Sequence, residues 1–255
     1  YPDGVSAVIV KNILPLKSRL NLNNWLYVFL PASVAKRKET SDKRFHISKT
    51  RVLQNMQQLQ SFIASLSLRK QKSEWNDYYQ ETILNEKYLR HKKQIVDELL
   101  RSIQSEITID IGCNTGEFSV IAAEHCKQVI SMDTDPYCVD RLYRKTVSKE
   151  IKNIQPIVAD ITNPSAADGW NNAERKSLLE RLNGDFVMAL ALIHHLALAK
   201  NIPLDMILET FAAITSKYLL IEFVPKTDPK AQILLHSKKD IYDSYFVENF
   251  ENFSA

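Results

Sequence analysis

Two glycines placed four residues apart are the first feature of the sequence that could do chemistry. Gly112 and Gly116 follow the short apolar run 107–111 and precede a stretch with helical spacing. The spacing is GxxxG, whereas dinucleotide sites carry GxGxxG, and Asp110 precedes the first glycine by two residues. A carboxylate near this helix N-terminus would repel a diphosphate and attract an ammonium group. The pattern disfavours a nicotinamide oxidoreductase and predicts a ligand with an amine and no phosphate.

Two more aspartates end the next two apolar runs of the chain. Asp133 follows Asp110 by 23 residues and stands where an acidic side chain can bind both hydroxyls of a ribose, and Asp160 ends the third run. Ligands of open α/β sheets bind at the carboxyl edge of the strands, so one nucleoside-like molecule could contact all three aspartates. A second interpretation applies to Asp160, because it precedes the turn residues Asn163-Pro164, where aspartate is common without a ligand.

The elements that must position these aspartates alternate after Ser105 between apolar runs and helical stretches. Runs that are apolar on both faces are typical of parallel strands covered by helices on each side, so the sequence predicts a doubly wound α/β sheet. Asp135-Pro136 and Asp228-Pro229 each offer a capping carboxylate followed by proline, so Asp135 is interpreted as a helix cap and not as a ligand. The five predicted strands are 107–111, 129–133, 154–159, 185–191 and 218–224.

The first 104 residues have a different spacing of apolar residues, which predicts a mostly helical accessory segment before a ligand-binding domain at 105–255. Apolar residues recur every three or four positions in 48–68 and 73–103, as on one face of a helix. The first thirty residues hold short apolar runs punctuated by proline, which are compatible with strands or extended connections, so no element is assigned to them. The chain starts without methionine, and only 31 residues follow Val224, so we expect a piece of a longer protein with C-terminal strands truncated.

Composition and charge narrow the function classes. Residues 31–72 hold ten lysines and arginines against two acidic residues, and we interpret this segment as a solvated helix face, with an anionic glycan or nucleic-acid contact as the alternative. No nucleic-acid motif accompanies it, so a nucleic-acid partner is not expected.

Three cysteines without metal-ligand spacing predict no metal site and fit a reducing cytoplasm. The longest apolar run, 186–193, is too short for a membrane span of ~20 residues, which predicts a soluble protein.

The aspartate and glycine pattern resembles the first motif of the class I S-adenosylmethionine-dependent methyltransferases, with Asn114 in place of the middle glycine. The resemblance covers roughly 105–224 and implies a Rossmann-like sheet with S-adenosylmethionine as cofactor and S-adenosylhomocysteine as product. It implies that Asp110 lies near the methionine amino group, that Asp133 lies on the ribose, and that Asp160 lies at the adenine. By the same resemblance the remaining cofactor-binding residues are Gly112, Cys113, Asn114, Gly116, Thr134, Ile161 and Leu190. Cys113 has a simpler interpretation as a small filler beside the turn.

Three further phrases are similar to a bacterial methyltransferase group that includes the nodulation protein NoeA. They are 159–165 (ADITNPS), 189–196 (ALALIHHL) and 221–226 (IEFVPK). The group is similar also in the helix that bears Trp75, Tyr78 and Tyr79, which would be lid or substrate residues. A second interpretation makes these aromatic residues the core of a helix pair. The resemblance implies that the reaction is methyl transfer, but it does not identify the molecule that accepts the methyl group.

The candidate catalytic residues are His194, His195 and Glu222. A histidine after the fourth strand could act as general base toward an acceptor hydroxyl, or it could simply shape the turn into the next helix. Glu222 near the end of the fifth strand would be costly as a buried charge without a partner. It must therefore form an ion pair, stay protonated or take part in the reaction. Apolar residues at 190–191 disfavour a base nitrogen as acceptor, so we expect O-methylation of a small molecule or glycan. The rival hypothesis is a non-catalytic cofactor-binding or assembly module of a longer protein.

Overall fold

The computed structural model describes residues 5–34, 48–66, 86–236 and 241–254. The chain divides into two compact units, one made of 1–69 with 168–175 and the other of 70–167 with 176–255. The boundary at 104/105 stays a prediction, and the helix that precedes it packs in the second unit. No helix in the described ranges combines the length and the apolar character that a membrane crossing requires.

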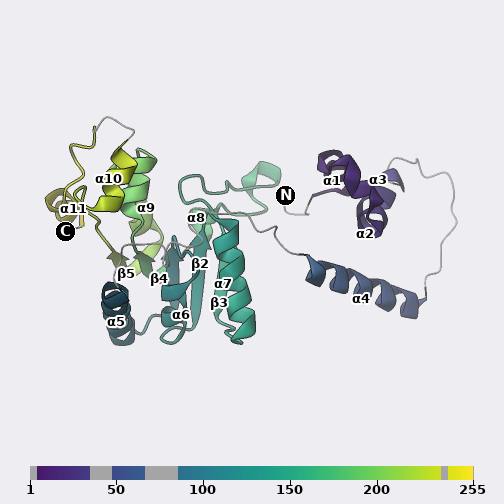
Figure 1. Cartoon of the computed structure of the whole chain (residues 1–255), viewed down its shortest axis with the longest axis horizontal. Coiled ribbons are helices and arrows are strands. Elements are labelled where there is room, and N and C mark those ends of the chain that lie inside the picture. Colours follow the sequence, from purple (N-terminus) through teal and green to yellow (C-terminus); the bar gives the residue numbers. More distant parts are fainter. Residues whose placement is uncertain (1–4, 35–47, 67–85, 237–240, 255) are drawn as a thin grey trace. The chain divides into compact units, whose positions relative to one another are not determined.

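The second unit is built on a five-stranded sheet in which every strand pair is parallel (Figure 1). The strand order is β3-β2-β1-β4-β5, so the chain reverses its direction of winding between β1 and β4. This confirms the predicted doubly wound, Rossmann-like sheet. The strands are β1 Ile107–Ile111, β2 Gln128–Asp133, β3 Ile154–Val158, β4 Gly184–Ala189 and β5 Thr215–Ile221.

Strand β4 ends two residues earlier than the prediction of 185–191. The reason lies in Ala191, whose φ of 51° falls in the left-handed region and breaks the extended conformation. The last pairing between β4 and β5 is the bond that the Glu222 N–H donates to the Ala189 carbonyl at 3.2 Å. After this bond both strands, β4 and β5, leave the sheet at its carboxyl edge.

Helices cover the sheet on both faces, and the strand residues alternate between two cores (Figure 1). Ile109 and Val187 face a core completed by α8, η4, α9 and α10, whereas Phe186 and Met188 face a core completed by α5, α6 and α7. Burial on both faces explains why the strands read as continuous apolar runs. The helical elements of this unit are α5 Glu86–Ile103, α6 Glu117–Ala123, α7 Pro136–Ser148, α8 Leu178–Arg181, η4 His195–Ala199, α9 Leu204–Ala213, α10 Pro229–Leu235 and α11 Val247–Ser254.

Both predicted helix caps are confirmed. The Asp135 carboxylate accepts the Tyr137 N–H at 2.8 Å and begins α7, and the Asp228 carboxylate accepts the Lys230 N–H at 2.8 Å and begins α10. In each case the intervening proline occupies the first helical position, where its missing N–H costs nothing. These caps fix where the chain turns away from β2 and β5.

The first unit is helical, which confirms the predicted helical N-terminal segment, and residues 7–34 form short helices where the sequence had left strands or extended connections open. Local capping decides the outcome, because Ser6 accepts the Ile9 N–H and Asn21 accepts the Asn23 N–H. Pro15 precedes the first residue of the 3₁₀ helix Leu16–Leu20, a position that proline tolerates. The elements are α1 Ala7–Ile13, η1 Leu16–Leu20, α2 Leu22–Asn24, η2 Trp25–Phe29, α3 Leu30–Val34, α4 Lys49–Ser65 and η3 Trp170–Asn172.

Candidate functional site

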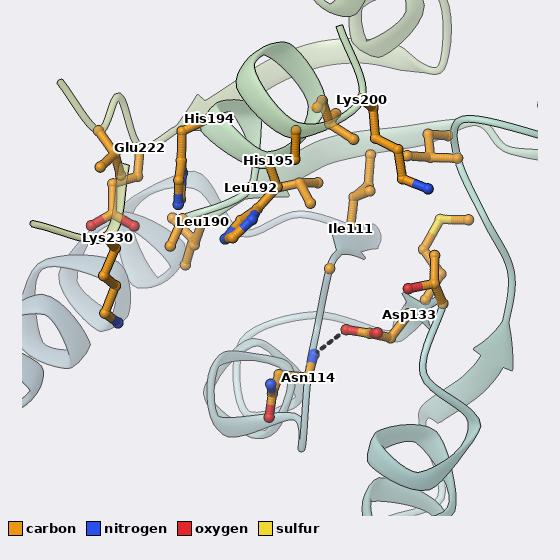
Figure 2. Close-up of a pocket in the computed structure, with 18 of the residues that line it drawn as sticks. Ile111, Asn114, Asp133, Leu190, Leu192, His194, His195, Lys200, Glu222 and Lys230 are labelled. Carbon is orange, nitrogen blue, oxygen red and sulfur yellow. Dashed lines mark hydrogen bonds between the residues drawn. The ribbon is translucent and has the colours of Figure 1, made fainter. Parts of the chain in front are cut away.

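A cavity of about 350 Å³ opens at the carboxyl edge of the sheet, where β1 and β4 part (Figure 2). This is the point at which the strand order reverses, and open α/β sheets bind their ligands there. Residues that follow all five strands line it, together with side chains of α5 and α10. Ten of the predicted site residues are among them: Gly112, Asn114, Asp133, Thr134, Asp160, Ile161, Leu190, His194, His195 and Glu222.

The glycine turn after β1 forms one wall of the cavity. Gly112 has φ +74° and Asn114 has φ 48°, conformations that glycine and asparagine accept most readily. A Cβ atom at Gly112 would lie 3.1 Å from Leu192 Cδ1, so the turn passes close to the loop after β4. The N–H groups of Gly112 and Cys113 both donate to the Met132 carbonyl, which holds the turn against β2.

Asp133 at the end of β2 is held by two backbone groups. Its Oδ2 accepts the Asn114 N–H at 2.8 Å, and its Oδ1 accepts the Asp135 N–H at 2.9 Å. Burial raises the pKa of Asp133, and these two hydrogen bonds oppose the rise. Each carboxylate oxygen keeps acceptor capacity for a further hydroxyl group. Figure 2 shows the carboxylate facing the Asn114 backbone beneath Ile111.

Asp160 after β3 is oriented by its own turn. Its Oδ1 accepts both the N–H and the hydroxyl of Thr162, at 2.8 and 2.7 Å. Asp160 therefore has the turn role that its sequence context suggested, and it also lines the cavity with Ile161. The neighbouring Ala159 N–H donates to the Asp133 carbonyl, which ties the ends of β2 and β3 together.

The structure places three predicted cofactor residues behind the cavity wall. Asp110 is 3% exposed, and Ser119 Oγ donates to its Oδ2 at 2.5 Å. Burial raises the pKa of Asp110 to about 7, with the Ser119 hydrogen bond opposing the rise. Cys113 is buried, and burial raises the pKa of its thiol, so it is no nucleophile at neutral pH. Gly116 is the N-cap of α6, and a Cβ atom there would lie 2.2 Å from Leu142 Cδ1.

His194 and His195 follow β4 and line the cavity with ring centroids 4.0 Å apart. Burial lowers the pKa of His194 to about 3, and burial lowers that of His195 to about 4, with the Lys230 charge adding to both effects. Both imidazoles are therefore neutral at pH 7 and each offers one N–H and one lone pair. Neither ring nitrogen of His194 has a hydrogen-bond partner among the described residues.

Glu222 is a paired carboxylate. Tyr88 donates its hydroxyl to Oε1 at 2.7 Å, and Lys92 donates its ammonium to Oε2 at 2.6 Å. Both partners stand on α5, so this cluster fastens the helix over the end of β5. Of the three outcomes open to Glu222, the structure selects pairing.

Several residues that line the cavity were not predicted as site residues from the sequence. They are Tyr88, Lys92, Leu192, Lys200 and Lys230. Lys230 could have been found, because the capping pair Asp228-Pro229 already placed it in the first turn of α10 beside the fifth strand. Tyr88 and Lys92 carry a weaker signal, the i,i+4 spacing that puts two polar tips on one helix face. The predicted lid residues Trp75, Tyr78 and Tyr79 lie outside the described residues.

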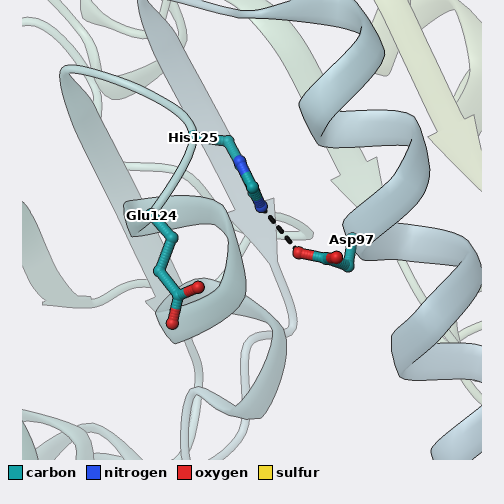
Figure 3. A group of neighbouring side chains, drawn as sticks. All are labelled: Asp97, Glu124 and His125. Atoms are coloured by element: carbon teal, nitrogen blue, oxygen red, sulfur yellow. Dashed lines mark hydrogen bonds and ion pairs between the residues drawn. The ribbon is translucent and has the colours of Figure 1, made fainter.

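A second group of polar side chains lies apart from the cavity, where α5 meets the turn after α6 (Figure 3). His125 Nε2 lies 2.6 Å from Asp97 Oδ1, and Arg101 pairs with the other oxygen of Asp97 at 2.8 Å. The His125 hydrogen bond lowers the pKa of Asp97. Glu124 completes a group whose ligand atoms lie within 4.8 Å. Because His125 and Arg101 already satisfy Asp97, we interpret this group as an attachment of α5.

Comparison with known proteins adds a relative that matches nearly the whole chain. Nodulation protein NoeA of Rhizobium meliloti (strain 1021) is 30% identical over 258 residues, which cover 97% of this chain and 54% of NoeA. The chain thus spans about half the length of this curated relative. The 23S rRNA (uracil(1939)-C(5))-methyltransferase RlmD of Legionella pneumophila (strain Corby) is 31% identical over 64 residues, 25% of this chain and 14% of RlmD. No protein-family model matches.

Among solved structures, the N-methyltransferase NodS from Bradyrhizobium japonicum WM9 aligns with 60% of this chain and 83% of its own, at 16% identity and a TM-score of 0.43. The sheet has the parallel order β3-β2-β1-β4-β5, and the turn after β1 carries the expected glycines beside Asp133. The chain therefore has a Rossmann-like sheet and is similar to NoeA along nearly its whole length, in agreement with the expected resemblance to the class I methyltransferases and to the bacterial group that includes NoeA.

Proposed function

We propose that the chain binds S-adenosylmethionine and transfers its methyl group to an oxygen of a small molecule or glycan. The observation that carries the proposal is the position of Asp133. It ends β2 at the cavity, and each of its oxygens is held by one backbone N–H with capacity left for a hydroxyl. A ribose with two adjacent hydroxyls matches that pair of oxygens.

The rest of the cavity fits the same ligand. Its volume of about 350 Å³ lies within the range of small-molecule sites. Gly112 leaves room at the turn that a Cβ would fill, and Asp160 with Ile161 would receive the adenine. Leu190 and Ile111 supply an apolar surface between the two ends. When bound, the cofactor supplies a methyl group already activated on a sulfonium, so the protein needs to align and desolvate more than to form covalent bonds.

The histidines after β4 give the chain its candidate proton acceptors. At neutral pH His194 and His195 are unprotonated, because burial lowers the pKa of both. A base with so low a pKa does not remove a hydroxyl proton in advance, but it can accept the hydrogen bond and take the proton as the oxygen becomes positive during transfer. Glu222 is bound by Tyr88 and Lys92, so we assign it the role of fixing α5 and the cavity wall.

A transfer experiment separates this function from the rival, a non-catalytic module. The chain would be incubated with methyl-tritiated S-adenosylmethionine and a panel of hydroxylated metabolites and sugars, and label in the acceptor fraction would be counted. The proposal expects transfer that falls at least tenfold in His194→Gln. Binding of S-adenosylhomocysteine without transfer to any acceptor, also in a chain extended at both ends, would favour the rival.

The setting of the reaction is part of the proposal. The acceptor is a small molecule or glycan, and a cytoplasmic location fits three cysteines that are thiols. The similarity to RlmD, whose name gives an rRNA uracil as its substrate, reaches only 25% of this chain, so it does not make nucleic acid the preferred acceptor.

A further inference from the structure

The N-terminal helices, at 5–34 and 48–66, expose most of their large apolar side chains. Within these two ranges only Phe29 and Ala32 are buried, and Leu16 and Leu20 are 76% and 90% exposed. Apolar surface of this extent is costly in water and marks a site where a partner or a membrane binds. The exposed apolar residues are Val5, Ile9, Ile13, Leu16, Leu20, Leu22, Trp25, Leu26, Leu30, Val34, Val52, Leu53, Met56, Ile63 and Leu66.

On α4 the exposed residues form a stripe along one face. Val52, Met56 and Ile63 recur at the spacing of one side of a helix, and all of them are exposed. The helix is attached to η2 through Phe62, whose ring stacks on Tyr27 with centroids 5.8 Å apart. Phe62 precedes Ile63 by one residue and therefore points about 100° away around the helix. The contact with Tyr27 thus leaves the apolar stripe uncovered within these helices.

The same helices carry positive charge alone. Their charged residues are Lys11, Lys17, Arg19, Lys49 and Arg51, and neither range contains an aspartate or a glutamate. Lys11, Lys17 and Arg19 each stand within two residues of an exposed isoleucine or leucine. The partner must therefore take up apolar side chains and offer negative charge beside them.

An anionic phospholipid bilayer meets both requirements. Interfacial helices insert their apolar side chains at the boundary of headgroups and hydrocarbon, while lysines and arginines contact the anionic headgroups. Trp25 belongs to a residue type that is enriched at this boundary. Nucleic acid fits these helices less well, because proteins meet it through polar and charged surfaces. A protein partner also fits less well, because the cores of protein interfaces are depleted of charge, whereas the segment Leu16–Leu20 mixes cations with leucines.

We propose that the N-terminal helices bind the surface of an anionic phospholipid bilayer. Their apolar side chains insert between the headgroups, and their lysines and arginines lie against the lipid phosphates. The inference goes beyond the proposed function and does not depend on it, since no residue of 5–34 or 48–66 lines the cavity. It gives the first unit a role of its own, that of holding the chain at a membrane surface.

Cosedimentation of the whole chain with vesicles tests the binding. The vesicles consist of phosphatidylcholine with or without about 30% phosphatidylglycerol, whose headgroup is anionic. We expect binding to the anionic vesicles to be at least tenfold tighter than binding to the neutral ones. It should weaken as sodium chloride is added, because salt screens the attraction between cations and headgroups.

Variants of exposed residues locate the contact. Leu16→Ser combined with Leu20→Ser should weaken binding to the anionic vesicles at least tenfold, because two inserted side chains are lost. Lys17→Gln should weaken it about fivefold, the effect of one cation near an anionic surface. The matched control is Val147→Ser combined with Lys149→Gln, an exposed pair in the second unit, which should bind like the unaltered chain. Circular dichroism checks that each variant keeps its fold.

The fluorescence of Trp25 gives a second readout. In a chain with Trp75→Phe and Trp170→Phe, Trp25 is the only tryptophan. Its emission should shift to shorter wavelength on the anionic vesicles, and brominated acyl chains should quench it, because the indole moves from water to the headgroup boundary.

Each outcome decides. Tighter binding to anionic vesicles that falls in the leucine and lysine variants, with a shifted Trp25 emission, supports the proposal. Absence of binding, equal binding to both kinds of vesicle, or binding that the leucine variant keeps would overturn it.

Two other occupants of this surface are tested without lipid. Analytical ultracentrifugation would overturn the proposal if the chain forms a dimer that the leucine variant dissociates, because the surface would then join two copies. Fluorescence anisotropy with a labelled RNA oligonucleotide would overturn it if RNA binds more tightly than the anionic vesicles and Lys17→Gln weakens that binding. Calorimetry with S-adenosylhomocysteine is run on the same samples, and its failure would count against the proposed function while the vesicle result stands.

Discussion

The backbone N–H of Asn114 donates to Oδ2 of Asp133 at 2.8 Å, and this bond joins the glycine turn after β1 to the end of β2. The same carboxylate therefore fixes the wall of the cavity and faces its interior. Removal of the carboxylate in Asp133→Ala should lower the affinity for S-adenosylhomocysteine at least tenfold, because the ribose hydroxyls lose their acceptor. Calorimetry measures the affinity, and circular dichroism checks that the fold is kept.

Asp140→Ala is the matched control for that variant. Asp140 stands on α7, pairs with Arg144 at 2.7 Å and does not line the cavity. We expect its affinity to equal that of the unaltered chain. Equal affinity in Asp133→Ala and the unaltered chain would remove Asp133 from the site.

The two turn glycines should respond differently to alanine. A Cβ at Gly116 would lie 2.2 Å from Leu142 Cδ1 and would stand at φ +74°, so Gly116→Ala should cost about 3 kcal/mol of unfolding free energy. Gly112 has the same φ, but its Cβ would approach Leu192 Cδ1 only to 3.1 Å. Gly112→Ala should cost about 1–2 kcal/mol and weaken cofactor binding. Urea unfolding gives both values, and a larger loss in Gly112→Ala would contradict the packing described here.

Asp110 should make the protein less stable as the pH rises. Its folded pKa is about 7, above the ordinary value of 3.8, because the carboxyl is buried. The folded chain then binds more protons than the unfolded chain between these values, so stability present below pH 3.8 is lost as the pH rises toward 7. Asp110→Asn removes this loss, which is up to about 4 kcal/mol, and its amide oxygen can still accept from Ser119. Urea unfolding at pH 5 and pH 8 should show the variant gaining on the unaltered chain at pH 8, and parallel pH profiles would refute this.

The pair of Asp97 with His125 should hold α5 in place above acid pH. The His125 hydrogen bond lowers the pKa of Asp97, so the stability it contributes is present above pH 3.8 and is lost as the pH falls below that value. Asp97→Asn should speed amide hydrogen exchange in 87–103 at pH 7 and should differ little from the unaltered chain at pH 3. Glu98→Gln is the control, because Glu98 is exposed and accepts a hydrogen bond from Gln94 on the same helix. Equal exchange at pH 7 in the two variants would contradict the attachment.

Most of the sheet could be predicted from the sequence because its strands are buried on both faces. Such strands read as short apolar runs, and the caps Asp135 and Asp228 mark where the following helices begin. Asp133 and Asp160 were predictable for the same reason, since each stands directly after such a run and the carboxyl ends of parallel strands meet at one edge.

The rest depended on contacts between distant parts of the chain. Nothing local shows that Ser119 covers Asp110, or that Tyr88 and Lys92 meet a glutamate 130 and more residues away. The elements of the first thirty residues could not be predicted because their apolar runs are too short to have a clear period, and side-chain caps decide their structure. Ala191 adopts a left-handed φ, and an alanine in the sequence gives no signal for that conformation.

The central claim is that this cavity binds S-adenosylmethionine, and calorimetry with S-adenosylmethionine, S-adenosylhomocysteine and NAD tests it most directly. The account predicts micromolar dissociation constants for both sulfur ligands and no binding of NAD. The turn after β1 has the spacing GxxxG, and Asp110, two residues before the first glycine, would repel a diphosphate. Failure of both sulfur ligands to bind the folded chain, or binding of NAD in their place, would contradict the account.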